Sequence, residues 1–327
     1  MLFSTGFPIQ DLTKWGVSLA ELTPETVSCR IPHFTQTQAS AYCETLARRH
    51  YENFPVVSFL LPKALRPHFF ALYAYCRWAD DLGDEVSEDA LSLQLLDWWE
   101  SELNALFDGQ TPRHPVFLAL GETVKEFGIP MAVFADLLTA FRQDRIQKEY
   151  AAREELLAYC RCSANPVGRL ILYLARMTDE EAFRLSDAIC TGLQLANFWQ
   201  DVARDWHEKR RIYLPKEDRE RFGYTETQFA QNVSTPEFQA LLEEEVRWAE
   251  SFFEAGRPLI QRVPRTFRLE IRLFHDGGKA ILNAVRKEKF CVWEKRPKLG
   301  KCAKLTLLFR ALTLECLTPL LHFFARR

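Results

Sequence analysis

The sequence predicts an all-α protein, folded as a single helical bundle around a central apolar cavity. Apolar residues recur at i, i+3 and i+4 along most of the chain from Ser87 onward, as on the buried side of a helix. No segment shows the period-2 alternation of a convincing β-strand. The composition includes 25 Phe and 8 Trp, and so many aromatic side chains line either a well-filled core or a cavity.

The helices are expected between short breakers such as Gly128 to Pro130 and Asn165-Pro166. Residues 1–35 carry three prolines with little periodicity and are interpreted as an irregular N-terminal arm, followed by one all-helical domain over 36–327. Pro62 and Pro67 open a helix that runs to Asp80. A charged loop is expected from His207 to Gly223. The other predicted helices are 35–53, 87–107, 115–127, 130–150, 154–163, 167–177, 179–206, 236–260, 264–289 and 301–324.

Composition points to a cytoplasmic protein. The nine cysteines are odd in number and contain no C-x-x-C pair, which favours buried thiols over a disulfide framework or zinc site. The first residues lack a basic segment followed by an apolar run, so no signal peptide is predicted.

Charge is spread unevenly along the chain. The net charge is −2, but residues 286–327 hold 11 Lys and Arg against 3 Asp and Glu. No recognisable nucleic-acid-binding module accompanies this basic region, so its expected partner is an anionic membrane surface, on the inner face of the membrane, or solvent. Residues 305–324 are apolar, but charged residues and Pro319 interrupt them, which favours a closing core helix or peripheral contact over a membrane span.

An acidic helix face is predicted within Leu193 to Pro215. Asn197, Asp201 and Asp205 recur every four residues and so share one side of a helix. Like charges at this spacing destabilise a helix by roughly 0.2–0.5 kcal/mol per pair, so a cation or a basic partner is expected between them.

A second acidic face lies upstream, where Asp80 and Asp84 have the same spacing and Arg77 precedes them. We expect the two faces to oppose each other. Hard cations such as Mg²⁺ prefer carboxylate oxygens and leave coordination positions to substrate phosphates, while arginine binds diphosphate bidentately. A diphosphate held in this way beside an apolar cavity suggests ionisation chemistry, with aromatic walls around the resulting carbocation.

These residues resemble the squalene/phytoene synthase family of head-to-head prenyl transferases over about residues 36–320. The similar motifs are Tyr73, Arg77, Asp80 and Asp84; Asn197, Asp201 and Asp205 followed by Arg211 to Pro215; and the segment from Tyr159 to Gly168. Within the family, residues 50–56, 163–168 and 196–205 look most like the hydroxysqualene synthase branch of bacterial hopanoid biosynthesis.

The resemblance implies an isoprenoid-synthase-type bundle that takes presqualene diphosphate to hydroxysqualene by ionisation, carbocation rearrangement and water capture. It also implies functional residues. Mg²⁺ would be bound by Asp80, Asp84, Asn197, Asp201 and Asp205, diphosphate by Arg77, Arg211 and Tyr213, and the cation would be flanked by Tyr73 and Tyr159. The enzymes before and after it in the pathway are further candidate partners.

Two departures from the family pattern bear on the reaction. Gln200 stands where many members that condense two prenyl diphosphates have Arg, which favours the second-step reaction. The run from Trp206 to Tyr213 is one residue longer than usual, which leaves open whether Arg210 or Arg211 contacts the diphosphate.

Two alternatives stay open. One is head-to-head condensation of two prenyl diphosphates, giving presqualene diphosphate, squalene or phytoene. The other is a non-catalytic helical assembly factor, against which the intact acidic residues argue.

Overall fold

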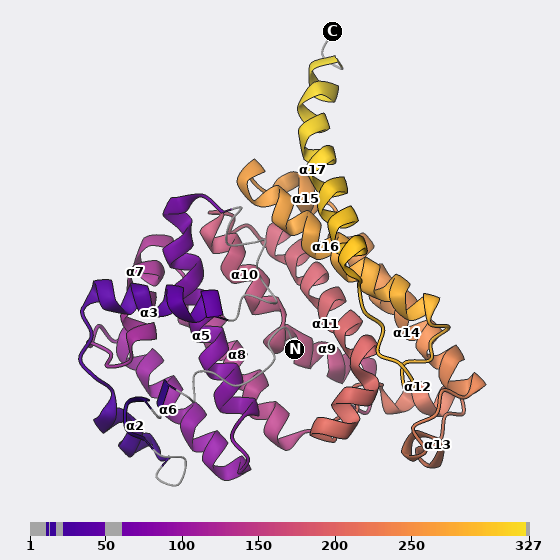
Figure 1. Cartoon of the computed structure of the whole chain (residues 1–327), viewed down its shortest axis with the longest axis horizontal. Coiled ribbons are helices and arrows are strands. Elements are labelled where there is room, and N and C mark those ends of the chain that lie inside the picture. The colour runs from indigo at the N-terminus through magenta and orange to yellow at the C-terminus, as the bar shows by residue number, and fades with distance from the viewer. Residues whose placement is uncertain (1–10, 13, 18–21, 50–60, 325–327) are drawn as a thin grey trace. The chain divides into compact units, whose positions relative to one another are not determined.

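The computed structural model describes residues 11–12, 14–17, 22–49 and 61–324, with side chains described as far as residue 315. Within these ranges the regular structure is helical, with one isolated bridge between Glu149 and Ile212, so the all-α prediction is confirmed (Figure 1). The described chain divides into two compact units, 1–146 with 169–178 and 147–168 with 179–327. The one-domain interpretation stays a prediction.

The first unit is built around α5 (Arg66–Asp84), which contacts most of the other helices of the unit. Pro67 lies in the first turn of α5, where its missing N–H costs no hydrogen bond. Every residue from Phe69 to Gly83 is buried, as expected for a helix with neighbours on all sides. The other helices are α2 (Pro24–Arg30), α3 (Gln36–Arg49), η2 (Lys63–Leu65), α6 (Asp89–Phe107), α7 (Pro115–Phe127) and α8 (Met131–Ile146).

An aromatic cluster fixes the position of α5 within the first unit. The Trp78 ring stacks on Trp99 of α6, with centroids 5.5 Å apart, and lies edge-on to His114 at 4.5 Å. His114 caps α7 by accepting the Val116 N–H at its Nδ1. Burial among these rings holds the pKa of His114 well below its usual range, so the imidazole is neutral and can serve as this acceptor.

The second unit is organised around α11 (Glu180–Lys209), which contacts α9 (Arg153–Ser163), α14 (Pro236–Gly256), α15 (Leu259–Arg262) and α16 (Arg265–Lys287). Asp179 caps its N-terminus by accepting the Ala182 N–H at 3.0 Å. Helix α10 (Asn165–Leu174) crosses the boundary at Gly168. The unit also contains α12 (Lys216–Arg221), α13 (Glu226–Ala230) and α17 (Lys301–Phe324).

Gly278 allows α16 to approach two neighbouring helices closely. A methyl group at this position would overlap the ring of Phe253 in α14 and lie 2.9 Å from Leu193 Cδ2 in α11. At the adjacent Gly277, a methyl group would meet nothing within 4 Å. The two glycines therefore differ in packing although they share a helix.

We expect Gly278→Ala to lower the free energy of unfolding by about 1–3 kcal/mol, because the core around Phe253 has no space for the methyl group. Gly277→Ala should instead raise it by about 0.5–1 kcal/mol, since alanine has less conformational freedom to lose in a helix. Urea denaturation of both variants checks this. Equal effects of the two substitutions would contradict the packing argument.

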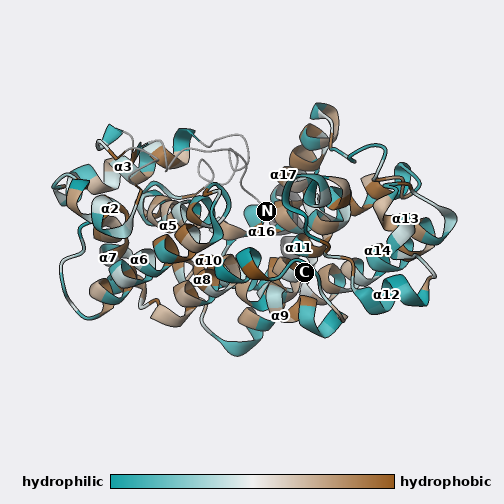
Figure 2. Cartoon of the chain, turned by 90° about the horizontal axis from the view of Figure 1, so that it is seen from below, coloured by the Kyte–Doolittle hydropathy of each residue, from teal (hydrophilic) through white to brown (hydrophobic). Residues whose placement is uncertain are grey.

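The structure differs from the predicted elements mainly at short helices. Pro24–Arg30 is helical, although residues 1–35 were expected to be irregular. The expected loop from His207 to Gly223 begins later, after Lys209, and contains α12. All six residues of α12 are charged, and its ribbon is teal in Figure 2. The sequence of α12 therefore has no apolar periodicity from which a helix could be predicted. Among the described residues, no helix is long and apolar enough to span a membrane.

Candidate active site

The acidic face of the first unit is buried, and a buried arginine lies beside its carboxylates. Arg77 is 1% exposed, and its Nη2 forms an ion pair with Asp81 one turn later. Its Nη1 lies 3.8 Å from Oδ2 of Asp80, which is 4% exposed. Asp84 is the last residue of the same helix and is half-buried. The predicted residues Arg77 and Asp80 are thus brought together, and Asp81 is an addition that sequence reasoning did not place in the site.

Tyr73 lies one turn before Arg77 on α5 and is buried. Burial raises the pKa of its phenol, the Arg77 guanidinium opposes that shift, and the Asp80 and Asp81 carboxylates add to it. The hydroxyl is therefore protonated at neutral pH. A neutral phenol ring beside an ion pair is suited to contact a cation through its face.

The acidic face of the second unit lies on α11 around a kink. Asn197 donates from Nδ2 to Asp201 Oδ2 at 3.1 Å, as the four-residue spacing predicts. At Asp201 the backbone leaves helical geometry, with φ −110° and ψ 15°, before the helix continues to Asp205. Asp201 is buried and Asp205 is half-buried. The three predicted ligands share one region of α11, although the helix between them is not straight.

Arg296 is a partner of this face that sequence reasoning missed. It lies in the segment between α16 and α17, and its Nη2 donates to Asp201 Oδ2 at 2.8 Å while its Nε pairs with Oδ1. The neighbouring Gln200 donates from Nε2 to the Pro297 carbonyl at 2.5 Å. The basic run that contains Arg296 was visible in the sequence, but nothing there joined it to Asp201, 95 positions away.

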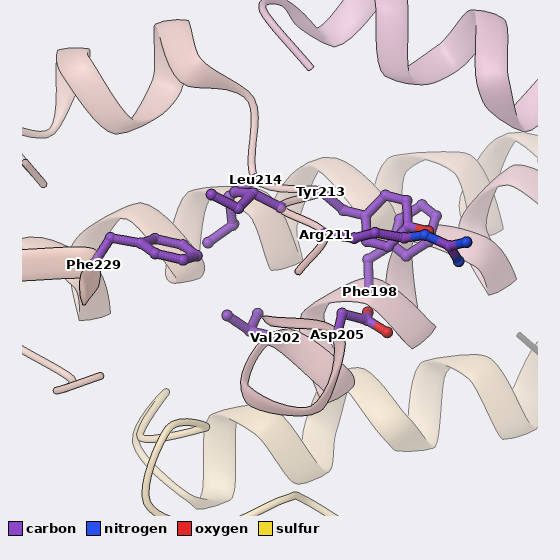
Figure 3. A pocket seen from close by; sticks show the side chains of 8 residues that line it. Phe198, Val202, Asp205, Arg211, Tyr213, Leu214 and Phe229 are labelled. Atoms are coloured by element: carbon purple, nitrogen blue, oxygen red, sulfur yellow. The ribbon is translucent and has the colours of Figure 1, made fainter. Parts of the chain in front are cut away.

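Asp205 and Arg211 line a small pocket beside the kink, together with Phe198, Val202, Ile212, Tyr213, Leu214 and Phe229. The cavity holds about 10 Å³, close to the space for one water molecule. Figure 3 shows the polar ends of Asp205 and Arg211 directed to the same side of the pocket, away from Phe229. The large apolar cavity expected from the composition stays a prediction.

Burial of Asp205 favours its neutral form. Burial raises its pKa to about 7, the Asp201 carboxylate adds to this, and Lys209 and Arg211 oppose it. A divalent cation between the carboxylates would replace this repulsion by attraction.

Arg210 and Arg211 occupy different environments. Arg210 is exposed at the C-cap of α11, where its φ is 53°, and its guanidinium lies 5.0 Å from the Trp206 ring centroid. Arg211 is 3% exposed and lines the pocket with Asp205. The placement favours Arg211 of the two as the residue for a buried anionic ligand.

An aromatic wall adjoins Arg211. The Tyr213 ring stacks on Phe198 of α11, with centroids 3.7 Å apart and planes inclined by 9°. Tyr159 of α9 lies 5.9 Å from Tyr213, and Tyr150 stacks on Tyr213 at 5.7 Å. The predicted residues Tyr159 and Tyr213 therefore belong to one cluster, to which Tyr150 and Phe198 also contribute. Four adjoining rings form a surface suited to a carbocation.

The side chains of the predicted metal ligands are chemically suited to Mg²⁺, because carboxylate and amide oxygens are the ligands that hard cations prefer. Within the described ranges, however, no group of three or more His, Cys, Asp or Glu side chains is arranged to hold a metal ion. The Asp201 carboxylate is instead bonded to Arg296. The acidic faces belong to different units, so their opposition across one site stays a prediction.

The sequence profile described as squalene/phytoene synthase matches residues 47–303, which is most of the chain. The chain belongs to the squalene/phytoene synthase family. All ten predicted site residues lie within the matched range, and the resemblance seen in the sequence is confirmed. The segment at residues 50–56, which contributed to that resemblance, lies outside the described residues.

Three family relatives illustrate the similarity. A hydroxysqualene synthase of Rhodopseudomonas palustris is 34% identical over 68% of this chain and 74% of its own length. A 15-cis-phytoene synthase of Synechocystis is 28% identical over 83% of each chain. The crystal structure of squalene synthase HpnC from Alicyclobacillus acidocaldarius is 41% identical, with a TM-score of 0.74 over 78% of this chain and 96% of that one. Family membership supports an enzyme with an all-α fold.

Proposed function

We propose that this squalene/phytoene synthase family member converts presqualene diphosphate to hydroxysqualene in a Mg²⁺-dependent reaction. The observation that carries the proposal is that Arg211, Asp205 and the stacked rings of Tyr213 and Phe198 line one pocket, which places a buried cation, an acid and an aromatic wall around it. Similarity to hydroxysqualene synthases supports this choice of product.

The proposed reaction begins when the C–O bond to the diphosphate breaks and the diphosphate leaves with the electron pair. Arg77, Arg211 and Tyr213 are proposed to bind this group, since two buried guanidiniums and a phenol can donate to its oxygens. Bound Mg²⁺, held by Asp80, Asp84, Asn197, Asp201 and Asp205, would supply charge neutralisation for the leaving diphosphate.

The carbocation left behind is proposed to rearrange between the rings of Tyr73 and Tyr159. Both side chains are buried, and both rings can stabilise positive charge without reacting with it. A water molecule then adds its oxygen to the rearranged cation and loses one proton, which gives the alcohol. Exclusion of other water from the apolar surroundings is what limits premature capture.

Gln200 supports the single-substrate reaction over the condensation. Its neutral amide donates from Nε2 to the Pro297 carbonyl. Its Oε1 lies 3.5 Å from Arg296 Nη2. An arginine at this position would add a positive charge beside Asp201, available to a second diphosphate. The similarity to a phytoene synthase over 83% of both chains keeps condensation as the second candidate.

Product analysis tests the proposal. We expect purified protein with Mg²⁺ to convert presqualene diphosphate to hydroxysqualene, and ¹⁸O-labelled water should place the label in the alcohol by mass spectrometry. Asp80→Asn should lower the rate by roughly 100-fold or more, whereas Asp97→Asn, whose side chain is 68% exposed on α6, should not. Formation of presqualene diphosphate from farnesyl diphosphate, without turnover of added presqualene diphosphate, would establish the condensation instead.

A further inference from the structure

We propose that Arg219 is a positioning residue, which holds residues 211–214 in the conformation that presents Arg211 and Tyr213 to the diphosphate. The inference rests on the proposed function for the diphosphate itself, and it adds a side chain that is not among those lining the pocket. Arg219 lies on α12 and is 3% exposed.

Residues 211–214, called here the 211–214 segment, connect the end of α11 to α12. All four residues line the pocket. In Figure 3, Arg211, Tyr213 and Leu214 follow one another along one side of it. The segment lies outside regular helices, so its conformation depends on bonds to other parts of the unit.

Backbone hydrogen bonds hold the 211–214 segment near its two ends. The Ile212 N–H donates to the Lys148 carbonyl at 2.7 Å. Just beyond the segment, the Lys216 N–H donates to the Tyr150 carbonyl at 2.9 Å. Neither bond involves the carbonyl groups of residues 213 and 214, which lie between them.

Arg219 supplies a contact in the middle of the segment. Its Nε donates to the Leu214 carbonyl at 3.2 Å, and its Nη2 forms an ion pair with Glu149. Glu149 is itself bridged through its backbone to Ile212, so the guanidinium joins two chain segments that run side by side. A planar guanidinium carries N–H donors on more than one edge and can make both contacts at once. Its removal would leave the buried Leu214 carbonyl without this donor.

A second buried residue of α12 holds the helix itself. Asp218 is 3% exposed and accepts from Arg153 Nε of α9 at 2.7 Å. Since this ion pair does not involve Arg219, α12 keeps an anchor to α9 when Arg219 is substituted. The expected consequence of that substitution is therefore displacement of the 211–214 segment rather than loss of α12.

Isothermal titration calorimetry of the full chain with inorganic pyrophosphate and Mg²⁺ tests the proposal, because it measures diphosphate binding without turnover. We expect Arg219→Met to raise the dissociation constant about tenfold or more. Arg221→Met is the matched control, because Arg221 lies on the same helix, is 54% exposed and pairs with Asp218 at 2.7 Å. Its dissociation constant should stay within about twofold of the parent value. Circular dichroism at the same temperature establishes that each variant is folded.

Two further variants separate positioning from stability. Arg219→Lys keeps the positive charge, but an ammonium lacks the fork geometry that serves the Leu214 carbonyl and Glu149 together. Its dissociation constant should therefore lie between those of the parent and Arg219→Met. In an Arg211→Met background, Arg219→Met should change the dissociation constant by less than about threefold, because Arg219 acts through Arg211. A loss of stability alone would not produce this dependence on Arg211.

The outcomes distinguish this proposal from the proposed reaction. A folded Arg219→Met variant that binds pyrophosphate as tightly as the parent overturns the positioning role, and so does an equal loss of affinity with and without Arg211. Failure of the unmodified chain to bind pyrophosphate would overturn the diphosphate role of Arg211 as well. A chain that binds pyrophosphate and shows the Arg219 effect, but forms no hydroxysqualene from presqualene diphosphate, would contradict only the proposed reaction.

Discussion

Replacing Arg77 by methionine should lower the free energy of unfolding by about 3–5 kcal/mol. The guanidinium pairs with Asp81, and both side chains are 1% exposed, with Asp80 nearby at 3.8 Å. Removing it leaves buried carboxylates with less compensation for their lost hydration. Chemical denaturation followed by circular dichroism measures the effect, and binding of substrate plays no part in it.

A surface ion pair with the same spacing provides the control for Arg77. Arg48 and Glu44 are also one turn apart on a helix of the first unit, at 2.7 Å, but their side chains are 52% and 45% exposed. Arg48→Met should therefore cost less than about 1 kcal/mol. Similar losses from both substitutions would show that burial does not decide the energetics of the α5 pair. Adding Asp81→Leu to Arg77→Met should recover part of the stability, because the pair is then replaced by apolar contacts.

The second large effect is a pH dependence centred on Asp205. Its pKa is raised from the usual 3.8 to about 7, chiefly by burial, so the folded chain holds a proton that the unfolded chain releases. The stabilising contribution is complete below about pH 4 and is lost as the pH rises through about 7. Asp205→Asn removes the ionisation and should leave stability less sensitive to pH over this range.

Unfolding free energies at pH 5 and pH 8, with a chelator present, check the prediction for Asp205. A pKa raised from 3.8 to about 7 corresponds to roughly 4 kcal/mol. Partial access of solvent to the carboxyl reduces the expected gain in stability of Asp205→Asn at pH 8 to about 2 kcal/mol. The gain should be smaller at pH 5. A difference between variant and parent that does not change with pH would contradict the assignment, and Asp97→Asn serves as the exposed control.

Long helices with strong end signals were predictable from the sequence. The bounds predicted for α7 match Pro115–Phe127, because Pro115 opens the helix and Gly128 takes a left-handed φ of 63° after its end. Helix α17 also has its predicted bounds. In contrast, α12 and α13 have six and five residues, which is too short for a repeat of 3.6 residues to become visible.

The site was predictable where its residues share a helix. Helical spacing alone relates Arg77 to Asp80, and Asn197 to Asp201, and the structure has both contacts. Contacts made through the fold had no such signal. Arg296 reaches Asp201 from another element, and Tyr150 joins the rings of Tyr159 and Tyr213 from the segment before α9. Such pairings depend on packing that a single sequence does not reveal.

The Arg296–Asp201 ion pair gives the acidic face of α11 a positive charge from the protein itself. A row of carboxylates without any counter-charge would need a bound metal ion in order to fold. Small metal-binding domains behave in this way, since they unfold when a chelator removes the metal. Here the chain supplies the counter-charge from the segment before α17. We therefore expect the second unit to fold without added metal.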